Sequence, residues 1–127
     1  PAPAYLFFNI PILEYETRIK PDTLKGVKLE GVGKCKDNGA AFPVIAGVKT
    51  IRACFCGHNH TNDYVVKADA VDLVYGRSTG YAGYGGEKLR KGAKLIEVDL
   101  VTGKYEQTTV FADGTKHFAG MRPSRTT

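Results

Sequence analysis

The stretch IRACFCGHNH, residues 51–60, decides the fold that the sequence predicts. Its first six residues, 51–56, form a short apolar run that is typical of a buried strand. Gly57 then turns the chain, and two histidines follow one residue apart, His58 and His60. Open α/β sheets place their binding sites at the carboxyl ends of strands, and imidazole is the commonest side-chain metal ligand. We therefore expect a functional site on this loop.

The residues before this strand predict a βαβ crossover. Residues 4–9 are apolar and aromatic, and the strand they predict ends at Asn9, because Pro11 lacks a backbone donor and forces the residue before it into an extended conformation. Residues 14–38 are polar and indicate a long loop with a turn or two of helix at its start. Residues 40–46 favour a short helix that a glycine ends. Two strands joined in this way are expected to be parallel neighbours.

The residues after the histidine loop predict antiparallel strands. Residues 64–67 and 71–75 are β-branched runs that indicate a hairpin. A glycine-rich segment, 76–86, allows close approach of the backbone to a ligand, although its spacing matches no phosphate-binding loop. Residues 93–100 alternate between apolar and polar, and 105–111 return as their hairpin partner. The expected fold class is α/β, with a βαβ crossover followed by a β-meander.

Size, composition and charge exclude several classes of protein. A chain of 127 residues predicts one domain. With 43% hydrophobic and 24% charged residues it is typical of a globular protein, and no apolar run approaches the ~20 residues of a membrane span. The net charge is +5, but the basic residues are scattered and follow no nucleic-acid-binding motif. The start, Pro-Ala-Pro-Ala directly before a strand, leads us to expect a fragment, a processed product or part of a longer chain. The compartment stays open.

The cysteines favour a structural role. There are three, Cys35, Cys54 and Cys56, and an odd number cannot form a closed disulfide framework. Cys54 and Cys56 point to the same face of their strand, where small buried side chains are expected. The C-x2-C spacing of thiolate zinc sites is missing.

The chemistry of two nearby imidazoles favours two metal ions over one. On a regular strand, side chains two residues apart are about 6.5–7 Å apart, which is too far for one tetrahedral ion. On a turn, His58 and His60 can diverge towards two ions about 3.5–4 Å apart. Such a site also needs carboxylates to bridge the ions. The alternative is a pair of surface histidines, and the preceding glycine and buried strand argue against it.

A family resemblance adds to this pattern. The segment GHNHTND, residues 57–63, resembles the last metal-binding block of the calcineurin-like metallophosphoesterases, and more narrowly that of the purple-acid-phosphatase-like, Dcr2-type branch. Three further segments resemble blocks of this branch in the same order: LFFNIPILEY at 6–15, NGAAFP at 38–43 and YGRSTGYAGYG at 75–85. The resemblance spans about residues 4–110.

The resemblance implies a fold, a cofactor and a reaction. The chain is expected to be the carboxyl-terminal half of a four-layer α/β/β/α sandwich, with a partial domain at residues 1–111 and a polar tail at 112–127. His58 would bind one metal ion and His60 the other, and the two ions would be divalent or trivalent Fe, Zn or Mn. A metal-activated water would then hydrolyse a phosphoester substrate.

Four more residues are expected near this site. Asn62 and Asp63 would fix the loop or accept the outer N–H groups of the imidazoles, since metal-bound histidines usually donate to an oxygen. For Tyr81 and Tyr84, on the glycine-rich segment, packing is the favoured role, and the alternative is that they flank a substrate pocket.

Two departures from the family pattern limit the expected activity. Asn9 stands where the family carries a histidine ligand, and an amide oxygen is a weaker ligand than imidazole for zinc or iron. The earlier family blocks, which supply the bridging carboxylate, are missing from this sequence. We therefore assign no catalytic residue and expect no hydrolysis by this chain alone. Either the amino-terminal half of the domain or another chain would cover its open sheet. The alternatives are a degenerate, non-catalytic subunit of a larger assembly and a small metal-binding module.

Overall fold

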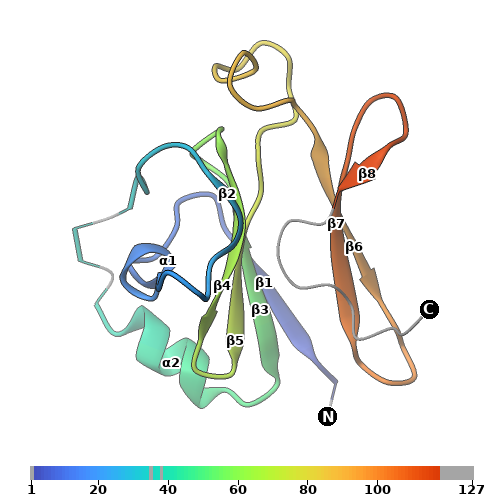
Figure 1. Cartoon of the computed structure of the whole chain (residues 1–127). Helices are drawn as coiled ribbons and strands as arrows, with labels where there is room; N and C mark the ends of the chain where they lie inside the picture. The colour runs from blue at the N-terminus through green and yellow to red at the C-terminus, as the bar shows by residue number, and fades with distance from the viewer. Residues whose placement is uncertain (1, 35, 38, 118–127) are drawn as a thin grey trace.

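The structure, a computed structural model, describes residues 2–34, 36–37 and 39–117. These residues form two sheets that face each other, and two helices lie on the outer side of the larger sheet (Figure 1). The larger sheet has the order β1-β3-β5-β4-β2 and consists of β1 Ala4–Phe7, β2 Lys25–Lys28, β3 Ile51–Cys56, β4 Asn62–Ala68 and β5 Val71–Tyr75. The smaller sheet consists of β6 Ala93–Val98, β7 Tyr105–Val110 and β8 Lys116–His117. The helices are α1 Glu14–Thr17 and α2 Ala41–Gly47.

The predicted crossover is confirmed. Strand β1 pairs with β3 in parallel, with Phe7 opposite Phe55, and α2 lies between the two strands in the sequence. Strand β3 also pairs in parallel with β5, and β5 pairs antiparallel with β4 as the predicted hairpin. The fold class is therefore α/β with a mixed sheet, and it is consistent with the carboxyl-terminal half of a phosphoesterase fold.

Strand β2 was not predicted and corrects the expected loop at 14–38. It pairs antiparallel with β4 at the edge of the larger sheet, where Gly26 lies opposite Tyr64. Its sequence, KGVK, gives no apolar pattern because its pairing rests on backbone hydrogen bonds and not on a buried face. Gly26 has a φ of 126°, and a Cβ there would lie 2.3 Å from the carbonyl oxygen of Asp63. Only glycine allows this close approach.

The smaller sheet provides the third layer. Strands β6 and β7 form the predicted hairpin, and residues 112–115 lead into β8, which pairs with β7. The rest of the expected polar tail, 118–127, lies outside the described residues. The described part of the chain therefore forms helices, a five-stranded sheet and a three-stranded sheet, and the fourth layer implied by the family is not among these residues.

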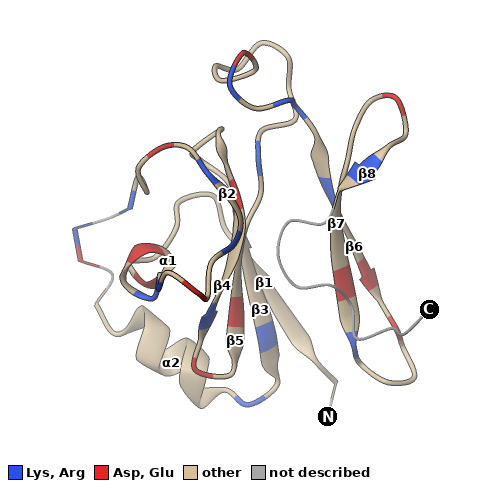
Figure 2. Cartoon of the chain, viewed as in Figure 1, with Lys and Arg blue, Asp and Glu red and all other residues tan. Residues whose placement is uncertain are grey.

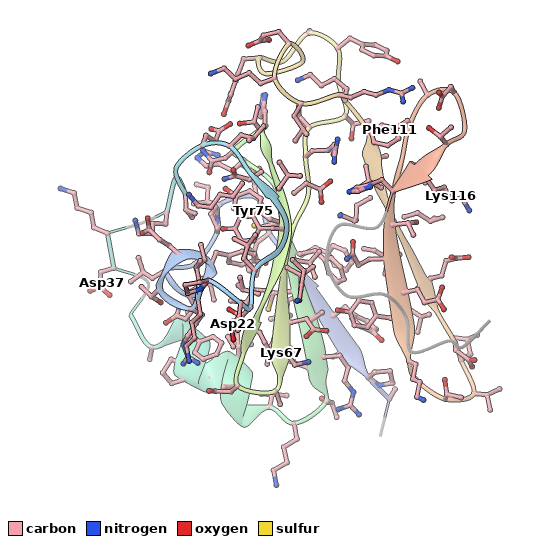
Figure 3. The ribbon with its side chains drawn as sticks, viewed as in Figure 1. Asp22, Asp37, Lys67, Tyr75, Phe111 and Lys116 are labelled. Carbon is pink, nitrogen blue, oxygen red and sulfur yellow. The ribbon has the colours of Figure 1, made fainter. Side chains whose placement is uncertain are left out.

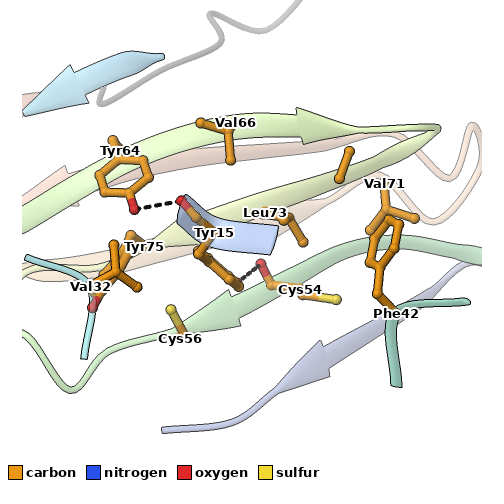
Figure 4. Packing of buried hydrophobic residues seen from close by; sticks show 11 residues of the cluster. Tyr15, Val32, Phe42, Cys54, Cys56, Tyr64, Val66, Val71, Leu73 and Tyr75 are labelled. Carbon is orange, nitrogen blue, oxygen red and sulfur yellow. Dashed lines mark hydrogen bonds between the residues drawn. The ribbon is translucent and has the colours of Figure 1, made fainter. Parts of the chain in front are cut away.

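The alternation of side chains along β3 divides the core between two sides of the larger sheet. Cys54 and Cys56 face the helices and pack with Tyr15 and Leu73 (Figure 4). Phe55 faces the smaller sheet. The two cysteines are buried, as predicted. The Tyr15 hydroxyl donates to the Cys54 carbonyl at 2.9 Å, which joins α1 to the sheet.

The basic residues of the described chain are spread over many elements. Figure 2 shows Lys and Arg distributed over both sheets and their loops, interspersed with acidic residues. Within the described ranges, every helix is too short to cross a membrane.

Candidate metal-binding loop

The histidine loop begins with a strained turn at the carboxyl end of β3. The Asn59 N–H donates to the Gly57 carbonyl at 3.0 Å and closes a three-residue turn around His58. His58 has a φ of 78°, which non-glycine residues rarely adopt and which costs about 1–3 kcal/mol. Such a conformation persists only where neighbouring contacts impose it.

Asn59 imposes this turn because its side chain points into the protein. Its Oδ1 accepts the Gly33 N–H at 2.7 Å and the hydroxyl of Tyr75, whose position Figure 3 shows. Its Nδ2 donates to a carboxylate oxygen of Glu30 at 3.1 Å. His58 is exposed, and a Cβ at Gly33 would lie 3.0 Å from its Cδ2. The residue between the two histidines therefore holds the loop while His58 stays accessible.

His60 is held in one tautomer. Its Nδ1 lies 3.0 Å from the backbone carbonyl oxygen of Tyr84, and a carbonyl can only accept, so Nδ1 carries the proton. The imidazole ring of His60 stacks on the phenol ring of Tyr84, with the ring centroids 3.9 Å apart and the ring planes inclined by 12°. The Tyr84 hydroxyl also accepts the backbone N–H of His60 at 3.2 Å. Nε2 keeps its lone pair, and imidazoles that bind metal through one nitrogen commonly donate the other N–H to a carbonyl.

Glu30 connects three loops behind the histidines. Its carboxylate accepts the Thr61 N–H at 2.9 Å, the Thr61 hydroxyl at 2.5 Å and the Tyr84 hydroxyl at 2.7 Å, besides the amide of Asn59. Burial raises the pKa of Glu30, but the hydrogen bonds from Thr61, Tyr84 and Asn59 outweigh it and hold this pKa at about 2. Glu30 is therefore a carboxylate at neutral pH.

Asn62 fixes the neighbouring loop. Its side chain is fully buried, and Oδ1 accepts the backbone N–H groups of Leu29 and Glu30, each at 3.1 Å. Its Nδ2 lies 3.4 Å from the Gly31 carbonyl. Asn62 thus holds the segment that carries Glu30, and its hydrogen bonds within the described chain reach neither histidine.

Asp63 joins the two sheets. Its carboxylate is fully buried and pairs with Arg77 Nε and Lys94 Nζ, each at 2.6 Å, and accepts the Thr109 hydroxyl at 2.7 Å. Arg77 is the second residue of the glycine-rich segment, while Lys94 and Thr109 belong to β6 and β7. Asp63 therefore positions the glycine-rich segment and the smaller sheet, and its described contacts do not include the imidazoles.

The glycine-rich segment approaches the loop closely. A Cβ at Gly85, where φ is 97°, would lie 2.6 Å from Thr61 Cγ2. Tyr84 stacks on His60, whereas Tyr81 is 80% exposed and contributes no side-chain hydrogen bond to the described site. Of the two tyrosines taken from the sequence, the structure brings Tyr84 to the histidine loop.

Asn9 lies beside the same loop. Its carbonyl accepts the Gly57 N–H at 3.3 Å, and its amide Oδ1 lies 3.9 Å from the point that a Gly57 Cβ would occupy. Asn9, His58 and His60 thus lie at the same end of the larger sheet. Among the described residues, no three His, Cys, Asp or Glu side chains gather as a metal-binding group. Two imidazoles and an amide include no bridging carboxylate, so these residues do not fit a complete dinuclear centre.

An apolar hollow of about 450 Å³ opens between the two sheets next to the loop. Phe7 stacks on Phe55 in its wall, with ring centroids 4.9 Å apart, and is 66% exposed. The opposite wall includes Ile96. Strands β1 and β6 are edge strands in the described sheets, so each has one backbone edge without a strand partner there.

Sequence reasoning missed Glu30 and Asn59. Both act through contacts between loops that are about 30 residues apart in the chain, and no local spacing encodes such contacts. One signal could have drawn attention to Asn59, namely its position between the two histidines. A turn at this position needs a side chain that stabilises it.

The comparisons with known proteins show which proteins this chain is similar to. The chain is 30% identical over 99 residues to "Probable inactive purple acid phosphatase 29" of Arabidopsis thaliana, 31% over 102 residues to number 28 and 26% over 99 residues to number 14. These matches cover 78–80% of the chain and 25% of each relative, so the chain spans about a quarter of their length. No protein-family model matches the sequence, and no solved structure matches it significantly. The chain is thus similar to purple acid phosphatase-like proteins, a family that generally uses a dinuclear metal centre.

Proposed function

We propose that this chain is the carboxyl-terminal part of a purple-acid-phosphatase-like protein of the Dcr2-type branch. In that protein, His58 and His60 form one wall of a metal-dependent site that hydrolyses phosphoesters. The remaining ligands come from outside the described residues, because the local donor set lacks a bridging carboxylate. This chain alone does not catalyse hydrolysis.

The orientation of His60 carries this proposal. The Tyr84 carbonyl fixes the proton on Nδ1, and the stacked Tyr84 ring fixes the plane of the imidazole. A surface histidine without a ligand has no need of either constraint. His58 adds a strained turn that keeps a second imidazole accessible at the same strand end. Together these features support a preorganised pair of ligands.

The apolar hollow supports a covering partner. We propose that the amino-terminal half of the same domain packs against Phe7 and adds backbone pairing along β1. The length of the relatives, about four times the matched segment, supports this choice. Hydrogen exchange tests it: the amides of β1 should exchange more slowly in a longer polypeptide that contains this half than in the 127-residue chain. Equal exchange in both would contradict the partner.

A second candidate function is a non-catalytic, phosphatase-like subunit. Asn9 favours it, because an amide replaces the imidazole expected there and weakens one ligand position. The relatives' printed names, which describe them as inactive, favour it as well.

Turnover of p-nitrophenyl phosphate separates the two candidates. The 127-residue chain should show none. A longer polypeptide that supplies the missing ligands should turn over the substrate. His58→Ala should lower the rate by at least about 10–100-fold, the loss that follows when even a residue supporting a metal ligand is replaced. Asn9→His should raise it. If the longer polypeptide is inactive both with Asn9 and with Asn9→His, the catalytic role is refuted and the non-catalytic role is supported. Activity that is indifferent to His58→Ala would refute the role of this histidine.

A further inference from the structure

Lys91 lies beside the imidazole of His60. Its Nζ donates to the Tyr84 carbonyl at 2.6 Å, and this is the same carbonyl that accepts Nδ1 of His60 at 3.0 Å. Both side chains also approach Gly83, where a Cβ would lie 2.8 Å from His60 Cε1 and 3.6 Å from Lys91 Nζ. A positive charge therefore stands next to the candidate metal ligand.

The charge of Lys91 is not neutralised within the described chain. Its second hydrogen bond goes to the Ser78 hydroxyl at 2.6 Å, so both of its acceptors are uncharged. No described carboxylate lies within ion-pair distance of Lys91, whereas Lys94 and Arg77 share Asp63. An ammonium group has three donors, and two are used here, which leaves one for an incoming acceptor.

Lys91 also lines a hollow of about 410 Å³ on the glycine-rich segment, together with Lys88, Arg90 and Glu87. Lys88 is exposed and makes no ion pair with a described residue, while Arg90 pairs with Asp113 at 2.9 Å. Glu87 is the one acidic residue in the described lining. Because Asp113 already pairs with Arg90, the excess positive charge comes from the two lysines that pair with no described carboxylate, Lys88 and Lys91, against Glu87, and it favours an anion in this hollow.

We propose that Lys91, Lys88 and Arg90 form an anion subsite that takes a second phosphate group of a phosphoester bound at the histidine loop. Lys91 connects the two places because it donates to the same Tyr84 carbonyl that orients His60, and it also lines the hollow. The subsite deepens the proposed function and rests on it for the identity of the substrate. It assigns that substrate to the phosphoesters that carry two or more phosphate groups. Lysine recognises phosphate as a point charge, which suits a group of variable geometry.

Inorganic pyrophosphate tests the subsite without metal. We would titrate the 127-residue chain with pyrophosphate and with inorganic phosphate in EDTA at low salt and follow binding by calorimetry. Pyrophosphate should bind more tightly than phosphate. Lys91→Gln should weaken pyrophosphate binding about tenfold, since it removes a charge-assisted hydrogen bond. The matched control is Lys49→Gln, which removes the same charge from an exposed lysine just before β3, at the opposite end of the sheet.

Lys88→Gln serves as a second variant, because replacement of Lys91 could also disturb the conformation of the glycine-rich segment. Because Lys88 is exposed and makes no ion pair with a described residue, this variant should fold normally and should still weaken pyrophosphate binding severalfold. Unchanged affinity in both variants, an equal loss in Lys49→Gln, or no preference for pyrophosphate would overturn the subsite. The result is independent of the proposed function: failure of metal binding would leave the anion result intact, and failure of anion binding would leave the metal loop intact.

Discussion

The imidazole of His60 and the phenol ring of Tyr84 lie almost parallel, with centroids 3.9 Å apart. The same tyrosine accepts two N–H groups of His60, Nδ1–H at its carbonyl and the backbone N–H at its hydroxyl, and donates its hydroxyl proton to Glu30. The glycine-rich segment therefore orients a histidine that the sequence places on a different loop. The position of Tyr84 explains why a loop far along the chain belongs to the candidate site.

Replacement of Tyr84 should weaken metal binding by His60, and the effect should be larger when more of the Tyr84 side chain is removed. Tyr84→Leu removes both the stacked ring and the hydroxyl, and we expect Zn²⁺ affinity at the loop to fall about tenfold, the lower range for loss of a group that orients a ligand. Tyr84→Phe keeps the ring, so its Zn²⁺ affinity should fall less. Calorimetric titration with Zn²⁺ measures both. If the two variants bind as tightly as the unchanged chain, Tyr84 does not orient the ligand.

Loss of the Asp63 carboxylate should destabilise the fold. Asp63→Asn leaves Arg77 and Lys94 largely buried without their counter-charge, and breaking a buried pair in this way costs about 3–5 kcal/mol. Urea unfolding followed by circular dichroism gives the free energy of unfolding. The control is Asp22→Asn, an exposed residue for which a change within about 0.5 kcal/mol is expected. A loss below 1 kcal/mol for Asp63→Asn would contradict the role assigned to this cluster.

Glu30 should make the free energy of unfolding depend on pH in the acidic range. Its pKa falls from the ordinary 4.5 to about 2 in the folded chain, so folding favours the carboxylate form. This contribution is fully present above pH 4.5 and is lost as the pH falls towards 2. The free energy of unfolding of the unchanged chain should therefore fall more steeply below pH 4.5 than that of Glu30→Gln. Glu97→Gln, at an exposed position, should keep the steep dependence. Parallel curves for the unchanged chain and Glu30→Gln would contradict the hydrogen-bonded carboxylate.

The thiols of β3 should be inert in the folded chain. Burial raises the pKa of Cys54 to about 11, and burial raises that of Cys56 further still. In a chain with Cys35→Ser, a thiol reagent such as dithionitrobenzoate should react with neither cysteine at pH 8 until urea unfolds the protein. Rapid labelling of the native chain would show that the helix side of the larger sheet is open to solvent.

The fold could be predicted where the pattern is local. The apolar run of β3 and the alternation along β6 each specify a strand within a few residues, and the return of residues 105–111 specifies the hairpin. Strand β2 could not be predicted because its four residues bury no apolar face and pair only through the backbone. The resemblance to the metallophosphoesterases implied four layers, and the described residues form helices and two sheets.

The site could be predicted in part. The rule that sites lie at the carboxyl ends of strands places Asn9 and the histidine loop together, and the structure brings them together. The contacts that orient the loop could not be predicted, because Glu30 and Tyr84 reach it from separate loops whose paths depend on tertiary packing. The role of His58 and His60 as metal ligands stays a prediction.

Long-range ¹H–¹⁵N spectra of the histidine rings during a Zn²⁺ titration test the central claim most directly. Before metal is added, His60 should carry its proton on Nδ1, because that nitrogen faces a carbonyl. Zn²⁺ should then shift the ring signals of His58 and of His60 Nε2 together and leave His117, an exposed histidine in β8, unchanged. His58→Ala should weaken the shift at His60. Equal shifts at all three histidines, or no shift at His58 and His60, would contradict a metal-binding role for this loop.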